Sequence, residues 1–312
     1  NNSIMENDDD GEETNCRIDY FASEGETVYF AVKYYSSSKV DDPFNVHIDF
    51  KESYVDSGVV YLKDIDANTK KDIYCVKGYK FNTPTDVTIL SKINGIPVTY
   101  IAESAFEDCE YLTSVTIPDS VKEVYNYAFC NCINLKTVTL GEGINFIDYF
   151  AFSGTAIESI TIPGSVKTIN QDAFRDCRNL KTVIFNEGIE NIYDWAFGNT
   201  AVESVTIPAS VKGFNGSVFA CCFDLKSISI ADANESYKSV DNVVYSKDGT
   251  ILIYAIPSLT GTFVVPEGVK SIEFDAFYAS SISGVNLSST VEYIGHHAFA
   301  YCTNLISVEL ND

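Results

Sequence analysis

Apolar and polar positions recur along most of this chain with a period of 22 or 23 residues. Each copy is marked by an Ala-Phe pair, or once by Val-Phe, that begins at Ala105, Ala128, Ala151, Ala173, Ala196, Val218, Ala276 and Ala298. The one longer step, of 58 residues (276 − 218), separates Val218 from Ala276. A fixed period of this length is typical of proteins that stack one small structural unit many times.

A single copy predicts two short strands and a corner. Val115 and Ile117 alternate with polar residues, which is the pattern of a half-buried strand. Pro118 ends this strand, because proline has no N–H to donate to a sheet. The segment 120–124 predicts a second short extended stretch. The segment 105–109 suits a single helical turn or a 3₁₀ corner.

No copy can bury its apolar side chains alone, so the copies are expected to stack into a solenoid with one continuous interior. This predicts an internal stack of the repeated phenylalanines, Phe106, Phe129, Phe152, Phe174, Phe197, Phe219, Phe277 and Phe299. A second repeated position, four residues after the alanine or valine, holds Cys109, Cys132, Cys177, Cys222 and Cys302. We interpret it as a packing position, since free cysteine is a small, readily buried hydrophobe.

The unit AFxxCxxLxxVxIPxSVxxV of residues 105–124 resembles the BspA-type leucine-rich repeat of bacterial surface proteins, and the resemblance extends from about residue 84 to residue 312. It implies a β-rich leucine-rich-repeat solenoid, a right-handed coil of 22–23-residue repeats, with a degenerate first coil. The long gap fits a hairpin insertion of this family at about residues 231–265, with its turn at Asp248-Gly249. The resemblance also implies a secreted or surface-attached protein that binds host or matrix proteins and has no catalytic residues.

The remaining residues predict two further regions before the solenoid at 83–312. Residues 1–15 carry six carboxylates and almost nothing apolar, which indicates a disordered acidic leader. They lack the features of a secretory signal, so the chain is either cytosolic or begins after a removed signal; the resemblance favours the second. Residues 16–82 predict a small sandwich-like all-β module, with strands at 27–34, 45–50, 59–62 and 73–76.

Charge and cysteine content narrow the possible partners and cofactors. The 21 basic residues against 44 acidic ones give a net charge of −23, which disfavours nucleic acid and membrane-surface partners and favours a cationic one. No stretch reaches the roughly 18 apolar residues of a transmembrane helix. A calcium-loop register through residues 6–17 fails at Arg17, and no cysteine spacing suits zinc, so we expect no metal and no other cofactor. Cys16 and Cys75 could form a disulfide in an oxidising compartment.

Aromatic residues cluster just before several Ala-Phe pairs, where the family usually has glycine and small polar residues. Stacking of neighbouring coils would bring them onto one edge; they are Tyr125, Tyr127, Tyr149, Phe150, Tyr193 and Trp195. Such side chains are enriched at binding hot spots, which predicts a ligand patch for a protein or a sugar. The alternative is that they only pack sideways on adjacent turns.

Catalytic signals are absent from the sequence. It has three histidines, His47, His296 and His297, and none lies in a nucleophile, phosphate-loop or metalloprotease motif. We therefore expect a non-enzymatic, extracellular or cell-surface adhesion protein that binds a host or extracellular-matrix protein or a glycan. The alternative is a structural spacer that presents another module and has no ligand of its own. The sequence leaves the ligand and the oligomeric state open.

Overall fold

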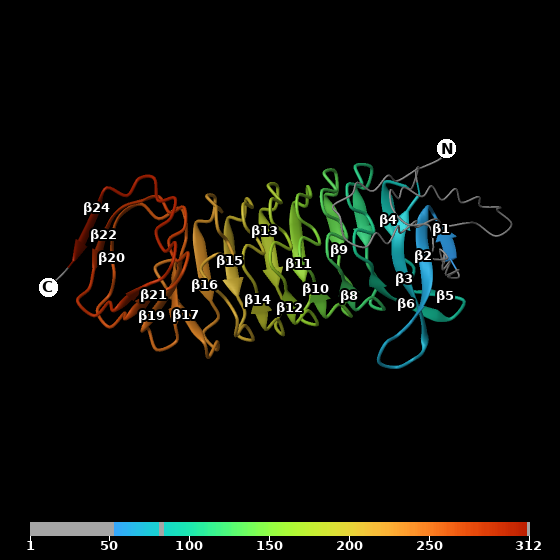
Figure 1. The fold of residues 1–312 in the computed structure, drawn as a ribbon, viewed down its shortest axis with the longest axis horizontal. Coiled ribbons are helices and arrows are strands. Elements are labelled where there is room, and N and C mark those ends of the chain that lie inside the picture. Colours follow the sequence, from blue (N-terminus) through green and yellow to red (C-terminus); the bar gives the residue numbers. More distant parts are fainter. Residues whose placement is uncertain (1–52, 81–83, 311–312) are drawn as a thin grey trace, which may run out of the picture.

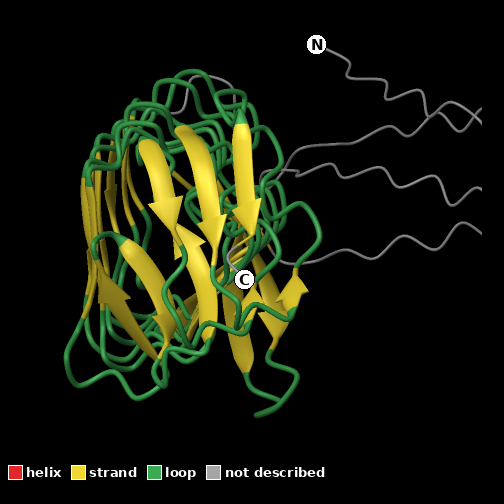
Figure 2. Cartoon of the chain, turned by 90° about the vertical axis from the view of Figure 1, so that its left-hand side faces the viewer, coloured by secondary structure: helices red, strands yellow, loops and turns green. Residues whose placement is uncertain are grey.

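The computed structural model describes residues 53–80 and 84–310, which form an elongated stack of β coils without any helix (Figure 1). The leader, the strands expected at 27–34 and 45–50, Cys16 and His47 all lie outside the described residues. Strands β1 and β24 lie at opposite ends of the stack. Figure 2, viewed from the C-terminal end, shows strands along the sides of the coil and loops at its corners. The predicted β-solenoid is confirmed.

One row of strands carries the predicted alternation of exposed and buried residues. It consists of three parallel sheets. Their strands are β4 (Asp86–Thr88), β7 (Ser114–Thr116) and β9 (Thr137–Thr139); β11 (Ser159–Ile162), β13 (Thr182–Phe185), β15 (Ser204–Ile207) and β16 (Ser227–Ile230); and β20 (Gly261–Val264), β22 (Ile282–Leu287) and β24 (Ser307–Leu310). In β11, Ser159 and Thr161 are exposed while Ile160 and Ile162 are buried. Period-two alternation therefore predicted these strands correctly.

A second row of shorter strands lines another side of the coil. Its first sheet contains β6 (Ile96–Ile101), β8 (Glu123–Val124), β10 (Phe146–Ile147), β12 (Thr168–Ile169) and β14 (Asn191–Ile192), paired in parallel. The row resumes with β19 (Ile251–Ala255), the last strand of the insertion's hairpin, and continues with β21 (Ser271–Ile272) and β23 (Tyr293–Ile294). The second extended stretch of each repeat is thus confirmed, mostly as a two-residue strand.

The Ala-Phe corner differs from the expected helical or 3₁₀ turn. It consists of two successive β-turns, closed in the second coil by the N–H groups of Ala128 and Cys132, which donate to the carbonyls of Tyr125 and Phe129. The third residue of each turn has a positive φ, 57° at both Tyr127 and Asn131. A left-handed residue cannot continue a right-handed helix, so the helical expectation was wrong.

The phenylalanine stack is confirmed. From Phe106 to Phe219 the rings of neighbouring coils lie 5.0–5.5 Å apart and nearly parallel. Tyr79 extends this stack at its N-terminal end, at 5.7 Å from Phe106. After the insertion, Phe277 and Phe299 stack again at 5.0 Å.

The repeated cysteine position is buried, as predicted, and the sulfur also makes a hydrogen bond that the sequence did not predict. Four of the five thiols donate to the carbonyl of the phenylalanine in the preceding coil: Cys132 to Phe106, Cys177 to Phe152, Cys222 to Phe197 and Cys302 to Phe277. In the 22-residue coils, Thr155 and Thr200 occupy this position and donate to Phe152 and Phe197. The position therefore selects a small donor.

The N-terminal strands and the insertion both join the solenoid sheets. β1 (Ser53–Asp56), β2 (Val59–Ile65) and β3 (Asp72–Tyr79) are antiparallel to one another, and β3 pairs in parallel with β6. β5 (Lys92–Ile93) forms a hairpin with β6. The strands expected at 59–62 and 73–76 are confirmed, whereas the division into domains at 15, 82 and 312 stays a prediction.

The insertion contains the expected hairpin. β17 (Tyr237–Val240), β18 (Val243–Ser246) and β19 are antiparallel, with Gly249 at a φ of 83° between the last two. β19 then pairs in parallel with β21. The apolar interior of the described residues, expected to be continuous, divides within the insertion into two clusters. Neighbouring residues of one strand belong to different clusters, as Val244 does to the first and Val243 to the second.

Candidate functional site

The six aromatic residues singled out in the sequence lie on the turns that follow β8, β10 and β14. These turns are those of the Ala-Phe corners, and we call this side of the solenoid the aromatic edge. Tyr149 and Tyr193 are 44% and 47% exposed, and the other four are half-buried. The stacking of coils therefore places all six on the expected edge.

Three of these residues occupy strained backbone. Tyr127, Phe150 and Trp195 have φ values of 57°, 55° and 56° at the third position of their turns. That position favours glycine or asparagine, and a bulky side chain there costs about 1–3 kcal/mol. The second turn follows the rule in the first five corners, with Asp108, Asn131, Gly154, Asp176 and Asn199 at its left-handed position, whereas Cys221, Ala279 and Tyr301 occupy that position in the last three.

The structure brings Tyr127 and Phe150 together. Their ring centroids are 5.1 Å apart and the rings are within 3° of parallel. The next coil places Asp172 at this step of the row, so Trp195 lies two coils beyond Phe150. The aromatic row is thus divided rather than continuous.

Trp195 belongs to a separate group that the sequence analysis missed. The guanidinium of Arg175 lies 4.8 Å from the centre of the indole, and Tyr278 packs against it edge-on at 5.4 Å. Tyr301 lies 5.0 Å from Tyr278. Arg175 and Tyr278 both come two residues after a repeated alanine, and that shared position was the available signal. Because the insertion separates these two coils in the sequence, the sequence does not reveal that they are close neighbours.

Tyr125 faces a different set of groups. It packs edge-on against Tyr100 at 5.3 Å and donates to the carboxylate of Glu123 at 2.5 Å. Burial, reinforced by that bond, raises the pKa of Tyr125. Its hydroxyl is therefore a neutral donor at physiological pH, and Tyr125 is more a structural part of the turn than an exposed contact.

Polar side chains beneath the aromatic edge are held by neighbouring coils. Asn170 donates to Asp148 at 2.7 Å, and the backbone N–H of Tyr149 donates to the same carboxylate at 2.8 Å. Burial raises the pKa of Asp194, and also that of Asp275, which lies 3.9 Å from His297. These contacts fix the turns that present the rings.

Neither a metal centre nor a catalytic arrangement emerges from the side chains that the structure describes. Within residues 53–80 and 84–310, no three His, Cys, Asp or Glu side chains are placed to hold a metal ion. The rings of His296 and His297 lie 3.8 Å apart and tilted by 41° on an exposed turn. The same residues contain no helix long and apolar enough to cross a membrane.

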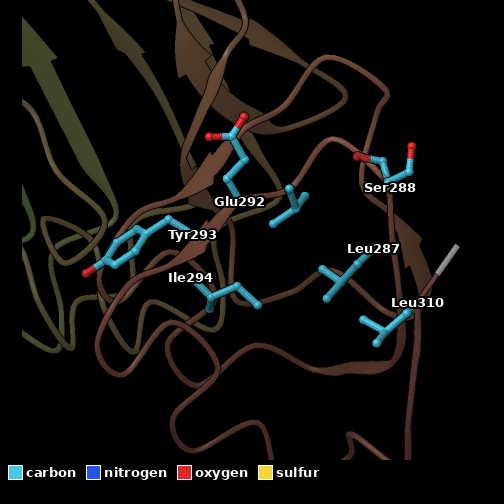
Figure 3. Close-up of a pocket in the computed structure, with 8 residues that line it drawn as sticks. Leu287, Ser288, Glu292, Tyr293, Ile294 and Leu310 are labelled. Atoms are coloured by element: carbon cyan, nitrogen blue, oxygen red, sulfur yellow. The ribbon is translucent and has the colours of Figure 1, made fainter. Parts of the chain in front are cut away.

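A hollow of about 310 Å³ lies at the C-terminal end of the described stack. Figure 3 shows Leu287, Ile294 and Leu310 around it, with Tyr293 directed away. Glu292 is the one carboxylate among its lining residues. The hollow therefore offers apolar surface but no acid-base pair.

Comparisons with known proteins agree with this architecture. Among solved structures, the pneumococcal vaccine antigen PcpA is 26% identical, with a TM-score of 0.71 over 83% of this chain and 70% of that one. A leucine rich cell surface protein from Faecalibacterium prausnitzii is 27% identical, with a TM-score of 0.58 over 84% of this chain and 77% of that one. No curated protein matched. The family described as BspA type leucine rich repeat region matches six copies, over residues 99–226, 145–247 and 254–312. The chain therefore belongs to the BspA-type leucine-rich repeat family.

Proposed function

We propose that this chain is a cell-surface or secreted recognition protein that binds a host or extracellular-matrix protein through its aromatic edge. Leucine-rich-repeat proteins generally bind proteins, and solenoids of this family are typically non-enzymatic. One solved relative is described as a cell surface protein and another as a vaccine antigen. A surface role for this chain agrees with both.

The observation that carries the proposal is the backbone strain at Tyr127, Phe150 and Trp195. Each ring sits at a left-handed position where asparagine or glycine would be more stable. Residues that break a local rule without stabilising the fold are expected at functional sites. Tyrosine, tryptophan and arginine are also the residues that dominate binding energy at protein interfaces.

The scaffold supports this role because its turns are already ordered. Backbone hydrogen bonds run from coil to coil beneath the edge, as from the N–H of Tyr127 to the carbonyl of Tyr149 at 3.0 Å. A preorganised surface loses little conformational freedom on binding, so a modest number of ring contacts can give useful affinity.

The test uses a triple variant, Tyr127→Asn, Phe150→Asn and Trp195→Asn. Asparagine tolerates the left-handed backbone, so the rings are removed without added strain. Binding to immobilised fibronectin, fibrinogen, laminin and collagen, and to a glycan array, is measured by surface plasmon resonance. We expect the triple variant to lose at least about tenfold in affinity for any protein bound by the wild type.

A matched control changes three exposed aromatic residues outside the six, Tyr54, Phe223 and Tyr293, to asparagine. This variant should keep wild-type affinity. Equal affinity in both triple variants would refute the aromatic edge as the binding surface. If the wild type bound only glycans, the proposed protein partner would be wrong and a glycan would take its place. If it bound nothing, the structural spacer would be favoured.

A further inference from the structure

Two coils of this solenoid are equivalent in frame but carry opposite charges at two equivalent positions. We call residues 173–195 the arginine coil and residues 105–127 the acidic coil. Both have 23 residues, and each ends on an aromatic residue at a left-handed turn position, Trp195 in the first and Tyr127 in the second. The two coils can therefore be compared position by position.

In the arginine coil, the chain binds a guanidinium group of its own. The Cζ of Arg175 lies 4.8 Å from the centre of the Trp195 ring. Its NH1 group contacts Asp172 at 3.1 Å, and its Nε atom contacts Asp176 at 3.5 Å. This arrangement of one ring and two carboxylates around a guanidinium combines a cation–π contact with ion pairs.

The acidic coil has the same backbone frame. Asp108 and Asp176 are equivalent residues with φ values of 56° and 59°. Asn131 donates to Asp108 at 3.0 Å, just as Asn199 donates to Asp176 at 2.5 Å. The carboxylate that contacts Arg175 in one coil thus has a counterpart in the other.

The cation is what differs. Arg175 and Arg178 of the arginine coil are replaced by Glu107 and Glu110 in the acidic coil. Asp108 and Glu110 are exposed and Glu107 is half-buried. In the preceding coil, the position equivalent to Tyr127 is held by Ser104, which is exposed and has no ring. Phe150 of the following coil covers the other face of Tyr127. The surroundings of Tyr127 therefore carry negative charge where those of Trp195 carry the chain's own arginine.

We propose that Tyr127, Glu107 and Asp108 receive an arginine side chain from the partner protein. Tyr127 and Asp108 are the counterparts of Trp195 and Asp176, which hold Arg175. Glu107 is the counterpart of Arg175 itself and would supply the second carboxylate, because the counterpart of Asp172 is Ser104. The inference rests on the proposed function and specifies the chemistry of its partner. An arginine is preferred to a lysine because the planar guanidinium is weakly hydrated and stacks on aromatic faces. The net charge of −23 would attract a basic segment from solution.

The test measures binding of tetra-arginine amide by isothermal titration calorimetry at 150 mM salt. Tetra-citrulline amide, which has the same shape without the charge, is the negative control. Glu107→Arg should lower the affinity about tenfold, because the new arginine would occupy the Tyr127 face from within. Tyr127→Asn should lower it about fivefold, whereas Tyr127→Phe, which keeps the ring, should bind as the wild type does.

Glu267→Arg is the matched charge control. Glu267 is exposed on the turn between β20 and β21, so this change alters net charge equally without touching Tyr127. Its affinity should fall less than about twofold. Equal losses in Glu107→Arg and Glu267→Arg, or equal binding of the citrulline peptide, would overturn the inference.

Failure of this inference is distinguishable from failure of the proposed function. One outcome is that the triple asparagine variant loses affinity for a matrix protein while the affinity for tetra-arginine is unchanged by substitutions at Tyr127 and Glu107. In that case the edge binds proteins but not through an arginine. If tetra-arginine binding follows the expected variant pattern while no matrix protein binds, the arginine site stands and the choice of partner is wrong.

Discussion

Two aromatic rows run along this solenoid only two residues apart in sequence. Phe129 and Phe152 of the inner row stack at 5.1 Å and 4°, and Tyr127 and Phe150 of the outer row stack at 5.1 Å and 3°. The ring geometry is the same in both rows. What differs is that the inner rings are fully buried, whereas the outer rings are half-buried and sit on left-handed backbone.

The comparison separates stability from function on one turn. The inner row is explained by the burial of apolar surface, which is the main favourable contribution to folding. The outer row has backbone strain that its partial burial and ring contacts must offset. The strain at these three positions is the basis of our proposal that the outer rings contact a partner.

The largest expected effect comes from removing an inner ring. Phe152→Ala should lower the free energy of unfolding by about 3–5 kcal/mol, because it leaves a cavity between Phe129 and Phe174 in a closely packed interior. Phe150→Asn should change it by less than about 1 kcal/mol, because relief of backbone strain offsets the lost stacking. Urea denaturation followed by circular dichroism measures both.

The variants Phe150→Asn and Phe152→Ala together test whether the two rows differ in their contribution to stability. Phe150 and Phe152 lie on the same corner and stack with neighbours at the same 5.1 Å spacing. If Phe150→Asn were as destabilising as Phe152→Ala, the outer row would be structural. The argument for a binding edge would then lose its support.

A smaller effect on the free energy of unfolding is expected at alkaline pH, and it comes from a buried cysteine on the inner side of the corner. Burial raises the pKa of Cys177 from its ordinary value of 9.0 to about 12. Above pH 9 the unfolded chain loses this proton while the folded chain keeps it, so stability falls as pH rises toward 12. Between pH 8 and 11, Cys177→Thr should reduce this fall by about 2–3 kcal/mol, measured by urea denaturation at each pH.

Threonine is the appropriate replacement because Thr155 and Thr200 already occupy this position in the shorter coils, where each donates to the phenylalanine carbonyl of its own coil. Phe150→Asn, which alters only the outer row, should leave the pH dependence unchanged. If Cys177→Thr and the wild type lost stability in parallel up to pH 11, the thiol would not be held in its neutral form by burial.

The sequence predicted the inner row much better than the outer one, for a physical reason. A periodic Ala-Phe pair defines its neighbours by coil stacking alone, so the stack from Phe106 to Phe219 followed from the spacing. The aromatic edge was also expected, but its division at Asp172 and its extension through Arg175, Tyr278 and Tyr301 were not. Those contacts depend on side-chain direction and on how the insertion brings distant coils together, neither of which a repeat period encodes.

The thiol–carbonyl bonds and the left-handed turns were missed for a related reason. A buried cysteine and a hydrogen-bonded cysteine look alike in sequence, so the position appeared to be one of packing only. The helical expectation for the corner failed because the left-handed residues inside it, Asp108 and Asn131 in the first two coils, were not recognised as a turn signal.

The smallest expected effect on stability tests whether the outer rings are held in an ordered arrangement. Gly198 lies under the indole of Trp195, and a Cβ atom there would come within 2.5 Å of its Cε3 atom. Gly198→Ala should therefore displace the indole from Arg175 and Tyr278, at a cost of about 1 kcal/mol in unfolding free energy. Because Trp195 is the single tryptophan of the chain, its fluorescence should shift to longer wavelength and be quenched more readily by acrylamide.

Arg175→Ala is the companion variant, since it removes the cation but leaves the space beside Gly198 intact. It should expose the indole less than Gly198→Ala does, because Tyr278 still packs against the ring at 5.4 Å. Unchanged emission and quenching in both variants would mean that the indole is not held in place by its neighbours. The ring would then be a mobile surface residue, and the comparison of an ordered outer row with an ordered inner one would fail at Trp195.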